Sequence, residues 1–261
     1  MKYSAFILIV SFFAFGACKS NKTPEKETVV EPQFGEDSDD PNLPLDERAQ
    51  KQAYFKLGIP SNEKCDIQLH QAYLNDDNLS DAIVTINRLS FAEFRCKNLK
   101  NYEILNRDGF VGNYNYIMIY DGATNKFSIP VPIPSSAKKV LNVDFEYIFS
   151  ESYTTPVITY RIKDAEFKNF YRLSDGVMDK VFKMKSYEDV GKKTEKAYSY
   201  EIQKDGMFSF AKDIKVFDAT LTNSQEISND WFGAKAQIKP TKTLDKVWYF
   251  DPKRNGYVTP N

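Results

Sequence analysis

The stretch Tyr114–Ile133 (YNYIMIYDGATNKFSIPVPI) predicts a β-hairpin near the middle of the chain. Its first arm, Tyr114–Tyr120, is rich in the aromatic and β-branched residues that pack well on a pleated sheet. Asp121-Gly122 follows, a pair that tolerates the positive φ angles of a tight hairpin turn. The second arm, Lys126–Ile133, carries alternating prolines that leave one edge without amide donors. We therefore expect it to be an edge strand or an extended connection.

The same hairpin signal recurs along the chain. Asp-Gly or Asn-Gly pairs occur at five places: Asp108-Gly109, Asp121-Gly122, Asp175-Gly176, Asp205-Gly206 and Asn255-Gly256. Around the second, third and fourth pairs, each flanking arm carries an aromatic residue. This irregular repeat predicts an all-β fold of hairpin-rich antiparallel sheets, either a propeller-like fragment or a β-sandwich. The spacing of the units is too uneven to count blades.

Residue periodicity supports this fold class. Asp46–Leu57 is the one convincing short helix, because its apolar residues recur at helical spacing and Gly58-Ile59-Pro60 stops it. The rest of the chain alternates at the period of a strand. Besides the two arms above, the strand candidates are Asp66–Leu74, Ala82–Leu89, Val157–Ile162, Asn169–Leu173, Lys180–Met184, Ala197–Gln203, Met207–Ala211, Ile214–Phe217 and Val247–Phe250.

The first residues have the composition of an export signal. Lys2 is the only charge before Cys18, and Ala5–Ala14 is an almost unbroken apolar run. That run is shorter than the roughly 20 residues needed to span a bilayer as a helix, so it predicts a cleaved signal over residues 1–17. Phe15-Gly16-Ala17-Cys18 resembles a bacterial lipobox, although Phe15 stands where an aliphatic residue is usual. The resemblance implies a lipid attached to Cys18, and the alternative is an ordinary secretory signal.

Residues 18–45 are predicted to be a disordered tether, because they are rich in Pro, Glu, Asp, Lys and Ser and poor in apolar residues. Residues 46–261 then form the β-rich extracytoplasmic domain. In composition the chain resembles lipoproteins of the Bacteroidetes, many of which are carried to the outer membrane. This resemblance implies a lipid-anchored protein of the cell envelope, facing either the periplasm or the cell surface.

Charge and cysteine content narrow the expected partners. The formal net charge is -1, and no basic patch predicts a nucleic-acid partner. After Cys18 only Cys65 and Cys96 remain, and an envelope compartment permits them to pair. Because both flank one predicted hairpin, we expect a disulfide between them, with two unpaired buried thiols as the alternative.

One loop resembles a calcium-binding motif. The segment Tyr73–Val84 (YLNDDNLSDAIV) is similar to the loop of FG-GAP or integrin-α-like repeats, in which oxygen ligands at alternate positions wrap a cation. The resemblance places Asn75, Asp77 and Asp81 at ligand positions and implies calcium as a cofactor. Tyr73 replaces an acid of the family, and Asn78 replaces its glycine. The alternative is a polar turn whose side chains cap their own backbone.

No catalytic set stands out. His70 is the only histidine, and no nucleophile-elbow glycine pattern accompanies it. We therefore expect a non-catalytic binding or structural domain that engages an envelope protein or a glycan. The alternative is an envelope hydrolase that acts on glycans through a pair of carboxylates. Tyr114, Tyr116 and Tyr120 share one face of a predicted strand, either as a glycan-stacking platform or through cross-strand packing.

Overall fold

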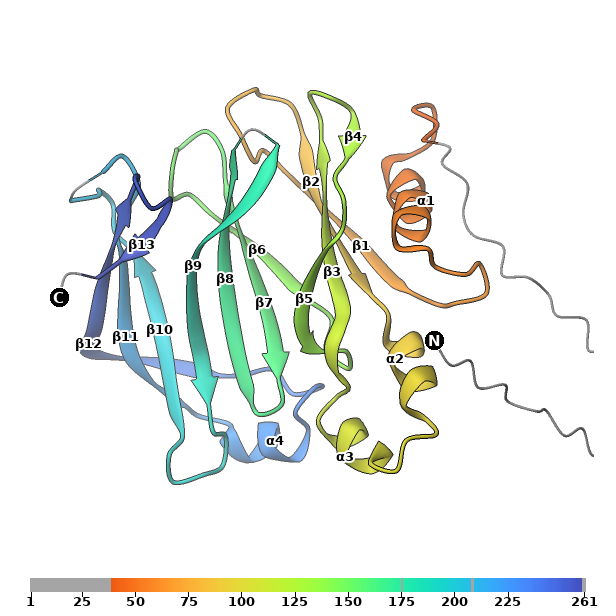
Figure 1. The fold of residues 1–261 in the computed structure, drawn as a ribbon. Helices are drawn as coiled ribbons and strands as arrows, with labels where there is room; N and C mark the ends of the chain where they lie inside the picture. The colour runs from red at the N-terminus through yellow and green to blue at the C-terminus, as the bar shows by residue number, and fades with distance from the viewer. Residues whose placement is uncertain (1–38, 175, 208, 260–261) are drawn as a thin grey trace, which may run out of the picture. The chain divides into compact units, whose positions relative to one another are not determined.

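The computed structural model describes residues 39–174, 176–207 and 209–259, and this part of the chain is mostly β, as predicted. The strands form two antiparallel sheets, called here the small sheet and the large sheet (Figure 1). By their contacts, the described residues belong to one compact unit. The predicted signal, Cys18 and most of the predicted tether lie outside the described residues. No helix among the described residues is long and apolar enough to cross a membrane.

The small sheet has five strands and runs in the order β1-β2-β3-β4, with β5 paired to the same edge of β3 as β4. The predicted strand Lys126–Ile133 is therefore divided in two, and its second part is an edge strand, as the prolines predicted. Every residue of β2 is buried, because Ile83 and Val84 contribute to cores on opposite faces. The strands are β1 (Asp66–Ala72), β2 (Asp81–Asn87), β3 (Val111–Asp121), β4 (Lys126–Phe127) and β5 (Val131–Ser136).

Helix α1 (Leu45–Leu57) covers the outer face of the small sheet. Its buried Ala49 and Ala53 pack against Val84 and Met118, and small side chains there allow the helix to approach the strands closely. The helix ends at Gly58, whose φ of 56° is left-handed and therefore favours glycine. The one helix that the sequence predicted is thus confirmed.

The large sheet is an eight-stranded meander in which each strand pairs with the next along the chain. Gly176, with φ 73°, lies between β8 and β9, and Asn255, with φ 46°, ends the turn between β12 and β13, so these two predicted hairpins are present. The strands are β6 (Asn142–Glu146), β7 (Thr155–Ile162), β8 (Ala165–Ser174), β9 (Val177–Glu188), β10 (Lys196–Ile202), β11 (Ile214–Leu221), β12 (Ile238–Asp251) and β13 (Gly256–Val258).

The two sheets share a hydrophobic core. Ile83, Ile117 and Ile133 of the small sheet cluster with Ile158 and Tyr171 of the large sheet. A second core lies on the other face of the large sheet and includes residues of β7, β8, β9, β11, β12 and β13. Of the two predicted architectures, the shared core favours the sandwich.

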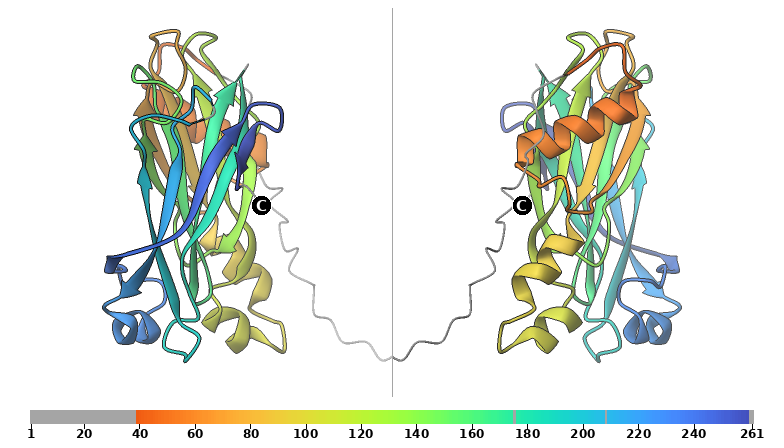
Figure 2. Two further views of the ribbon diagram at one scale, coloured as in Figure 1. Left: turned by 90° about the vertical axis from the view of Figure 1, so that its left-hand side faces the viewer. Right: turned by 90° about the vertical axis from the view of Figure 1, so that its right-hand side faces the viewer.

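Several local predictions are wrong. Asp108-Gly109 follows helix α3 instead of turning a hairpin, and Asp205-Gly206 lies in the long connection between β10 and β11. In that connection, the described residues of Met207–Ala211 form no strand. Three helices were not predicted: α2 (Leu89–Cys96), α3 (Tyr102–Arg107) and α4 (Ser224–Asn229). Helices α2 and α3 come between β2 and β3 along the chain, and their residues contribute to a small core that includes Ala92 and Phe110. Figure 2 shows these helices at one end of the sheets.

Candidate functional site

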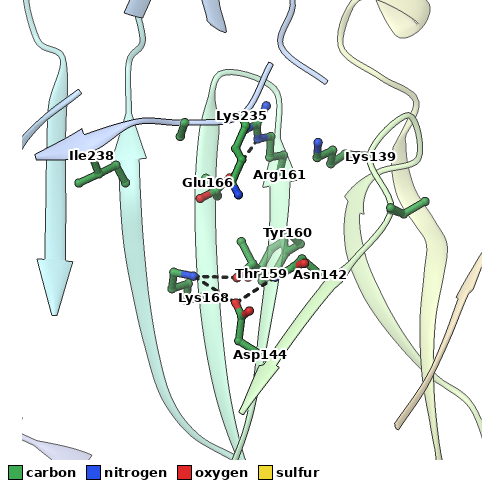
Figure 3. A pocket seen from close by; sticks show the side chains of 12 residues that line it. Lys139, Asn142, Asp144, Thr159, Tyr160, Arg161, Glu166, Lys168, Lys235 and Ile238 are labelled. Atoms are coloured by element: carbon green, nitrogen blue, oxygen red, sulfur yellow. Dashed lines mark hydrogen bonds and ion pairs between the residues drawn. The ribbon is translucent and has the colours of Figure 1, made fainter. Parts of the chain in front are cut away.

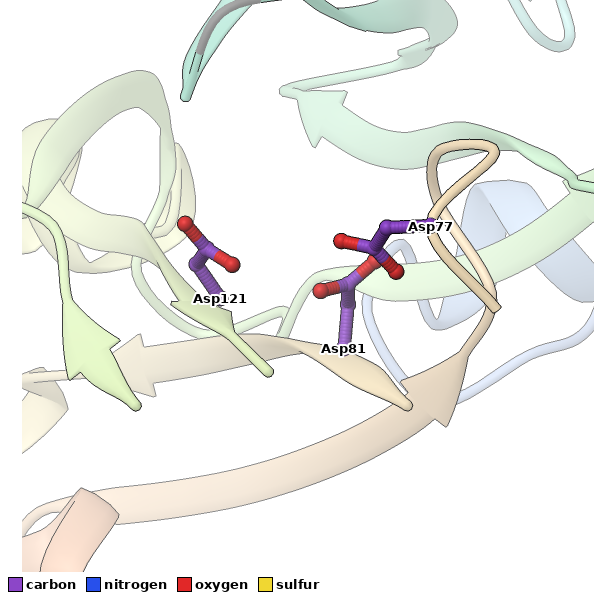
Figure 4. A group of neighbouring side chains, drawn as sticks. All are labelled: Asp77, Asp81 and Asp121. Carbon is purple, nitrogen blue, oxygen red and sulfur yellow. The ribbon is translucent and has the colours of Figure 1, made fainter. Parts of the chain in front are cut away.

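The predicted calcium loop is part of a cluster of three carboxylates. Asp77 lies in the loop before β2, Asp81 is the first residue of β2, and Asp121 is the last residue of β3 (Figure 4). One carboxylate oxygen from each residue lies within 4.8 Å of the other two. Sequence reasoning missed Asp121 as a member of this cluster. Pairing of Ala82 with Tyr120 places it beside Asp81.

Asp81 is fully buried, and each of its oxygens already accepts a hydrogen bond. Oδ2 accepts from the backbone N–H of Leu74 at 3.0 Å, and Oδ1 accepts from that of Gly122, also at 3.0 Å. Burial raises the pKa of Asp81 above its ordinary value, and the charges of Asp77 and Asp121 raise it further. A cation at this cluster would reduce that repulsion.

The loop itself has the backbone caps of a polar turn. Asn75 Oδ1 accepts from the N–H of Asp77 at 2.8 Å, and Asp77 Oδ1 accepts from the N–H of Leu79 at 2.7 Å. Asn78 has a φ of 60°, the left-handed conformation for which the resembled motif uses glycine. The predicted turn is confirmed, and calcium binding by Asn75, Asp77 and Asp81 stays a prediction.

The predicted disulfide is not formed, because Cys65 and Cys96 are both free thiols in the structure. Each cysteine has its own surroundings. Cys65 precedes β1, and its Sγ donates to Glu63 Oε1 at 3.3 Å, whereas Cys96 is buried among Ala92 and Phe110 at the end of α2. The hairpin that they flank, β1 with β2, is formed, but the chain after β2 continues as helix α2, which was not predicted and which places Cys96 at its far end.

A charged pocket of about 640 Å³ lies over β6, β7 and β8 of the large sheet (Figure 3). Strand register builds its floor, because Thr159 pairs with Asn142 on one side and with Lys168 on the other, and Arg161 pairs with Glu166. The volume is within the range of roughly 300 to 1,000 Å³ that is usual for small-molecule sites. The lining residues are Lys139, Val140, Asn142, Asp144, Thr159, Tyr160, Arg161, Glu166, Lys168, Lys235, Ala236 and Ile238.

Arg161 holds one wall of this pocket in place. Its side chain is 3% exposed and forms an ion pair with Glu166 at 3.1 Å. The same guanidinium donates to the backbone carbonyls of Trp231 and Ala234, the latter at 2.9 Å. Because one rigid fork satisfies a carboxylate and two carbonyls, the wall segment 231–236 is tied directly to β7.

Two lysines occupy different positions in the pocket. Lys139 Nζ donates to the carbonyl of Phe232 at 2.8 Å, and burial, with Arg161 nearby, lowers its pKa. Lys168 Nζ donates to Thr159 Oγ1 at 2.9 Å and lies 3.8 Å from a carboxylate oxygen of Asp144. Sequence reasoning found none of these residues, since they come from strands and a connection that are far apart along the chain.

The other residues discussed from the sequence have structural surroundings. His70 lies on β1, with Nε2 3.4 Å from Thr85 Oγ1, and burial lowers its pKa. The ring of Tyr120 packs against its cross-strand partner Phe127 at 5.1 Å between centroids. Tyr116 belongs to the same apolar cluster, and Tyr114 to the core beside α2. Cross-strand packing thus accounts for Tyr120.

Comparison with known proteins identifies no relative: no family model, no curated protein and no solved structure matches this chain.

Proposed function

We propose that this chain is a lipid-anchored protein of the cell envelope whose β domain binds an acidic ligand without catalysis. The charged pocket over β6, β7 and β8 carries this proposal. The membrane anchor is the lipid predicted at Cys18, with the outer membrane as its proposed location. A glycan that bears carboxylates is the ligand class that suits both the pocket and the envelope.

The charges of the pocket favour an anion. Four cationic side chains line it, against the two acids Asp144 and Glu166. Arg161 neutralises Glu166 at 3.1 Å, and Lys168 lies 3.8 Å from Asp144. Lys139 and the exposed Lys235 are then in excess, so the pocket has an unbalanced positive charge. Positive charge in a concave site attracts anions and aligns them.

Binding is better supported than the hydrolase alternative. A glycosidase of the carboxylate-pair type needs one acid that stays protonated at working pH. Each acid of the pocket instead lies against a cation, Glu166 against Arg161 at 3.1 Å and Asp144 against Lys168 at 3.8 Å, so neither of the two acids that line the pocket is unpaired. The proposal therefore gives Asp144 and Glu166 the role of holding Lys168 and Arg161 in position.

Titration calorimetry with oligogalacturonate and with a neutral oligosaccharide of equal length tests the ligand class. We expect saturable binding of the acidic oligomer alone, and at least tenfold weaker binding in Lys235→Glu. Lys253→Glu is the matched control, because Lys253 is an exposed lysine in the turn between β12 and β13. Equal affinity for both sugars, or equal affinity of the two variants, would contradict the proposal. An envelope protein as ligand would leave both oligosaccharides unbound.

Metabolic labelling with a palmitate analogue tests the anchor. We expect label on the chain when it is purified from the membrane fraction, and no label on Cys18→Ser purified in the same way. Label retained in Cys18→Ser would place the lipid elsewhere, and absence of label from both would indicate an ordinary secretory signal.

A further inference from the structure

The helical segment between β2 and β3, residues 88–110, exposes large apolar side chains. Phe94 is 63% exposed, Leu99 49% and Ile104 53%. They come from α2, the turn after it and α3, so they lie within eleven positions of one another. Figure 1 shows the two helices where β3 begins. Exposed apolar residues on one short segment mark interaction surfaces more often than scattered single ones do.

The opposite side of the same segment is packed against the domain. Ala92 and Cys96, one turn apart on α2, are buried with Phe110 and Ala137, and Tyr102 and Leu105 of α3 pack beside them. These side chains fill the small core, and neither Phe94 nor Ile104 is one of them. Phe94 and Ile104 are directed away from it and contribute nothing to that core.

Basic residues alternate with the exposed apolar ones along this segment. Between residues 93 and 107 the exposed charged side chains are four cations (Arg95, Lys97, Lys100 and Arg107) and two acids (Glu93 and Glu103). Arg107 is paired with Asp108 at 3.0 Å, so the three other cations exceed the two acids by +1, in a chain whose total is -1. Lys97 Nζ lies 4.5 Å from the ring centroid of Phe94, so a cation and an exposed apolar side chain are adjacent on the surface.

We propose that this segment docks on the surface of a membrane that contains anionic lipids. Separate aromatic and aliphatic side chains enter the boundary between headgroups and acyl chains, and Lys and Arg beside them attract anionic headgroups. The positive charge opposes docking of a second copy of the same patch. This contact goes beyond the proposed pocket and is independent of it. Together with the proposed lipid at Cys18 it would hold the domain in one orientation.

Vesicle flotation tests the proposal on residues 33–261, the compact unit that contains the hydrophobic cores described above. Leaving out residues 1–32 removes Cys18 and the apolar run before it from the measurement. We expect flotation with phosphatidylglycerol vesicles and weak flotation with phosphatidylcholine vesicles, with a difference that shrinks as salt is added. The double variant Phe94→Ser/Ile104→Ser should have a partition coefficient onto these vesicles at least about tenfold lower, because two apolar side chains that enter the membrane are lost. Lys97→Glu/Lys100→Glu should remove the preference for anionic lipid.

Ile129→Ser is the matched control, since Ile129 is 79% exposed in the connection between β4 and β5 and outside the patch. It should float like the parent unit, and thermal melts should show that all variants are folded. The proposal is overturned if the parent unit floats with no vesicle, if the double variant floats equally well, or if charge reversal leaves lipid preference unchanged. Lys235→Glu should float normally, so that failure of the pocket and failure of the patch are separate results.

Discussion

Asp81 Oδ1 accepts a hydrogen bond from the backbone N–H of Gly122, a residue 41 positions further along the chain, at 3.0 Å. Its other oxygen binds the N–H of Leu74. One buried carboxylate therefore joins the loop before β2 to the turn after β3. The closeness of this contact also explains the glycine, because a Cβ at position 122 would lie 2.5 Å from the carbonyl oxygen of Ser80.

Gly122→Ala should lower the free energy of unfolding by about 1 to 3 kcal/mol, since the added methyl group would overlap the backbone of Ser80, which cannot shift as easily as a flexible side chain. Gly176→Ala is the comparison: a methyl group there would have no atom within 4 Å, and only the φ of 73° opposes alanine. That strain costs about 1 kcal/mol. Urea denaturation measures both. A cost for Gly122→Ala no greater than that for Gly176→Ala would contradict the close approach.

Asp81→Asn should change how stability depends on pH. The pKa of Asp81 is raised in the folded protein, so between its ordinary value of 3.8 and the folded value the folded state binds more protons than the unfolded state. The stability contributed by this group therefore falls as pH rises through that window and is constant above it. The difference in the free energy of unfolding between the parent and Asp81→Asn should therefore become smaller as pH rises through this window.

At neutral pH the same variant should cost about 1 to 3 kcal/mol, because an amide offers one oxygen and leaves the N–H of Leu74 or Gly122 without an acceptor. Asp76→Asn is the control, an exposed acid in the same loop, and should change stability by less than about 0.5 kcal/mol. Urea titrations at several pH values provide the measurement. A difference that is independent of pH would exclude a raised pKa for Asp81.

Strands were the most predictable part of this fold. Tyr114–Tyr120 and Val157–Ile162 were found because sheet-forming residues dominate them, and hairpins were found where Gly176 or Asn255 takes a positive φ. The same reasoning failed at Asp108-Gly109, since Gly109 uses its φ of 79° to leave a helix. One residue of the pair has a positive φ at three of the five places, Gly109, Gly176 and Asn255, and the flanking residues decide whether that angle ends a helix or turns a hairpin.

The candidate sites were predictable only where they are local. Asn75, Asp77 and Asp81 follow a motif spacing, but Asp121 joins them through the pairing of β2 with β3. The charged pocket depends wholly on pairing, because Asn142, Thr159 and Lys168 become neighbours only in the register of β6, β7 and β8. Helices α2 and α3 were missed because they are only eight and six residues long, too short for apolar residues to recur at a recognisable helical spacing.

Calcium at millimolar concentration should raise the melting temperature if the three carboxylates hold a cation. For an extracellular-type site with a Kd of about 0.1 to 1 mM, 10 mM calcium would stabilise by about 1.4 to 2.7 kcal/mol, or roughly 3 to 10 °C. Asp77→Asn and Asp121→Asn should each reduce the shift, because each removes a charged oxygen donor. The control is the parent with chelator. An unchanged melting temperature would leave the loop as a polar turn alone.

Cys65 and Cys96 should both react with a thiol reagent in denatured protein without any reductant, since both are free in the structure. In the folded protein Cys65 should react slowly: burial, reinforced by the Glu63 carboxylate that accepts from its Sγ, raises its pKa to about 12. Its thiolate at pH 8 is then about a thousandfold rarer than for an ordinary cysteine. Mass spectrometry of timed alkylation measures both rates. If the cysteines react only after reduction, the result would contradict the free thiols and support the disulfide predicted from the sequence.

Arg161→Leu should be among the most destabilising changes at the pocket. It leaves Glu166, whose side chain is 13% exposed, without its cation, and it leaves the carbonyls of Trp231 and Ala234 without a donor. Removing one partner of a buried ion pair typically costs about 3 to 5 kcal/mol. Arg161→Lys keeps the charge but cannot reach three acceptors at once, so its cost should be about 1 to 3 kcal/mol.

Arg107→Leu is the matched control, because Arg107 also pairs with an acid but is 65% exposed at its side chain. A pair of this kind contributes about 1 kcal/mol or less. Urea denaturation gives the three free energies, and the fluorescence of Trp231, with Trp231→Phe to identify its signal, reports whether the wall segment has moved. If Arg161→Leu costs no more than Arg107→Leu and the Trp231 spectrum is unchanged, the guanidinium does not hold the wall.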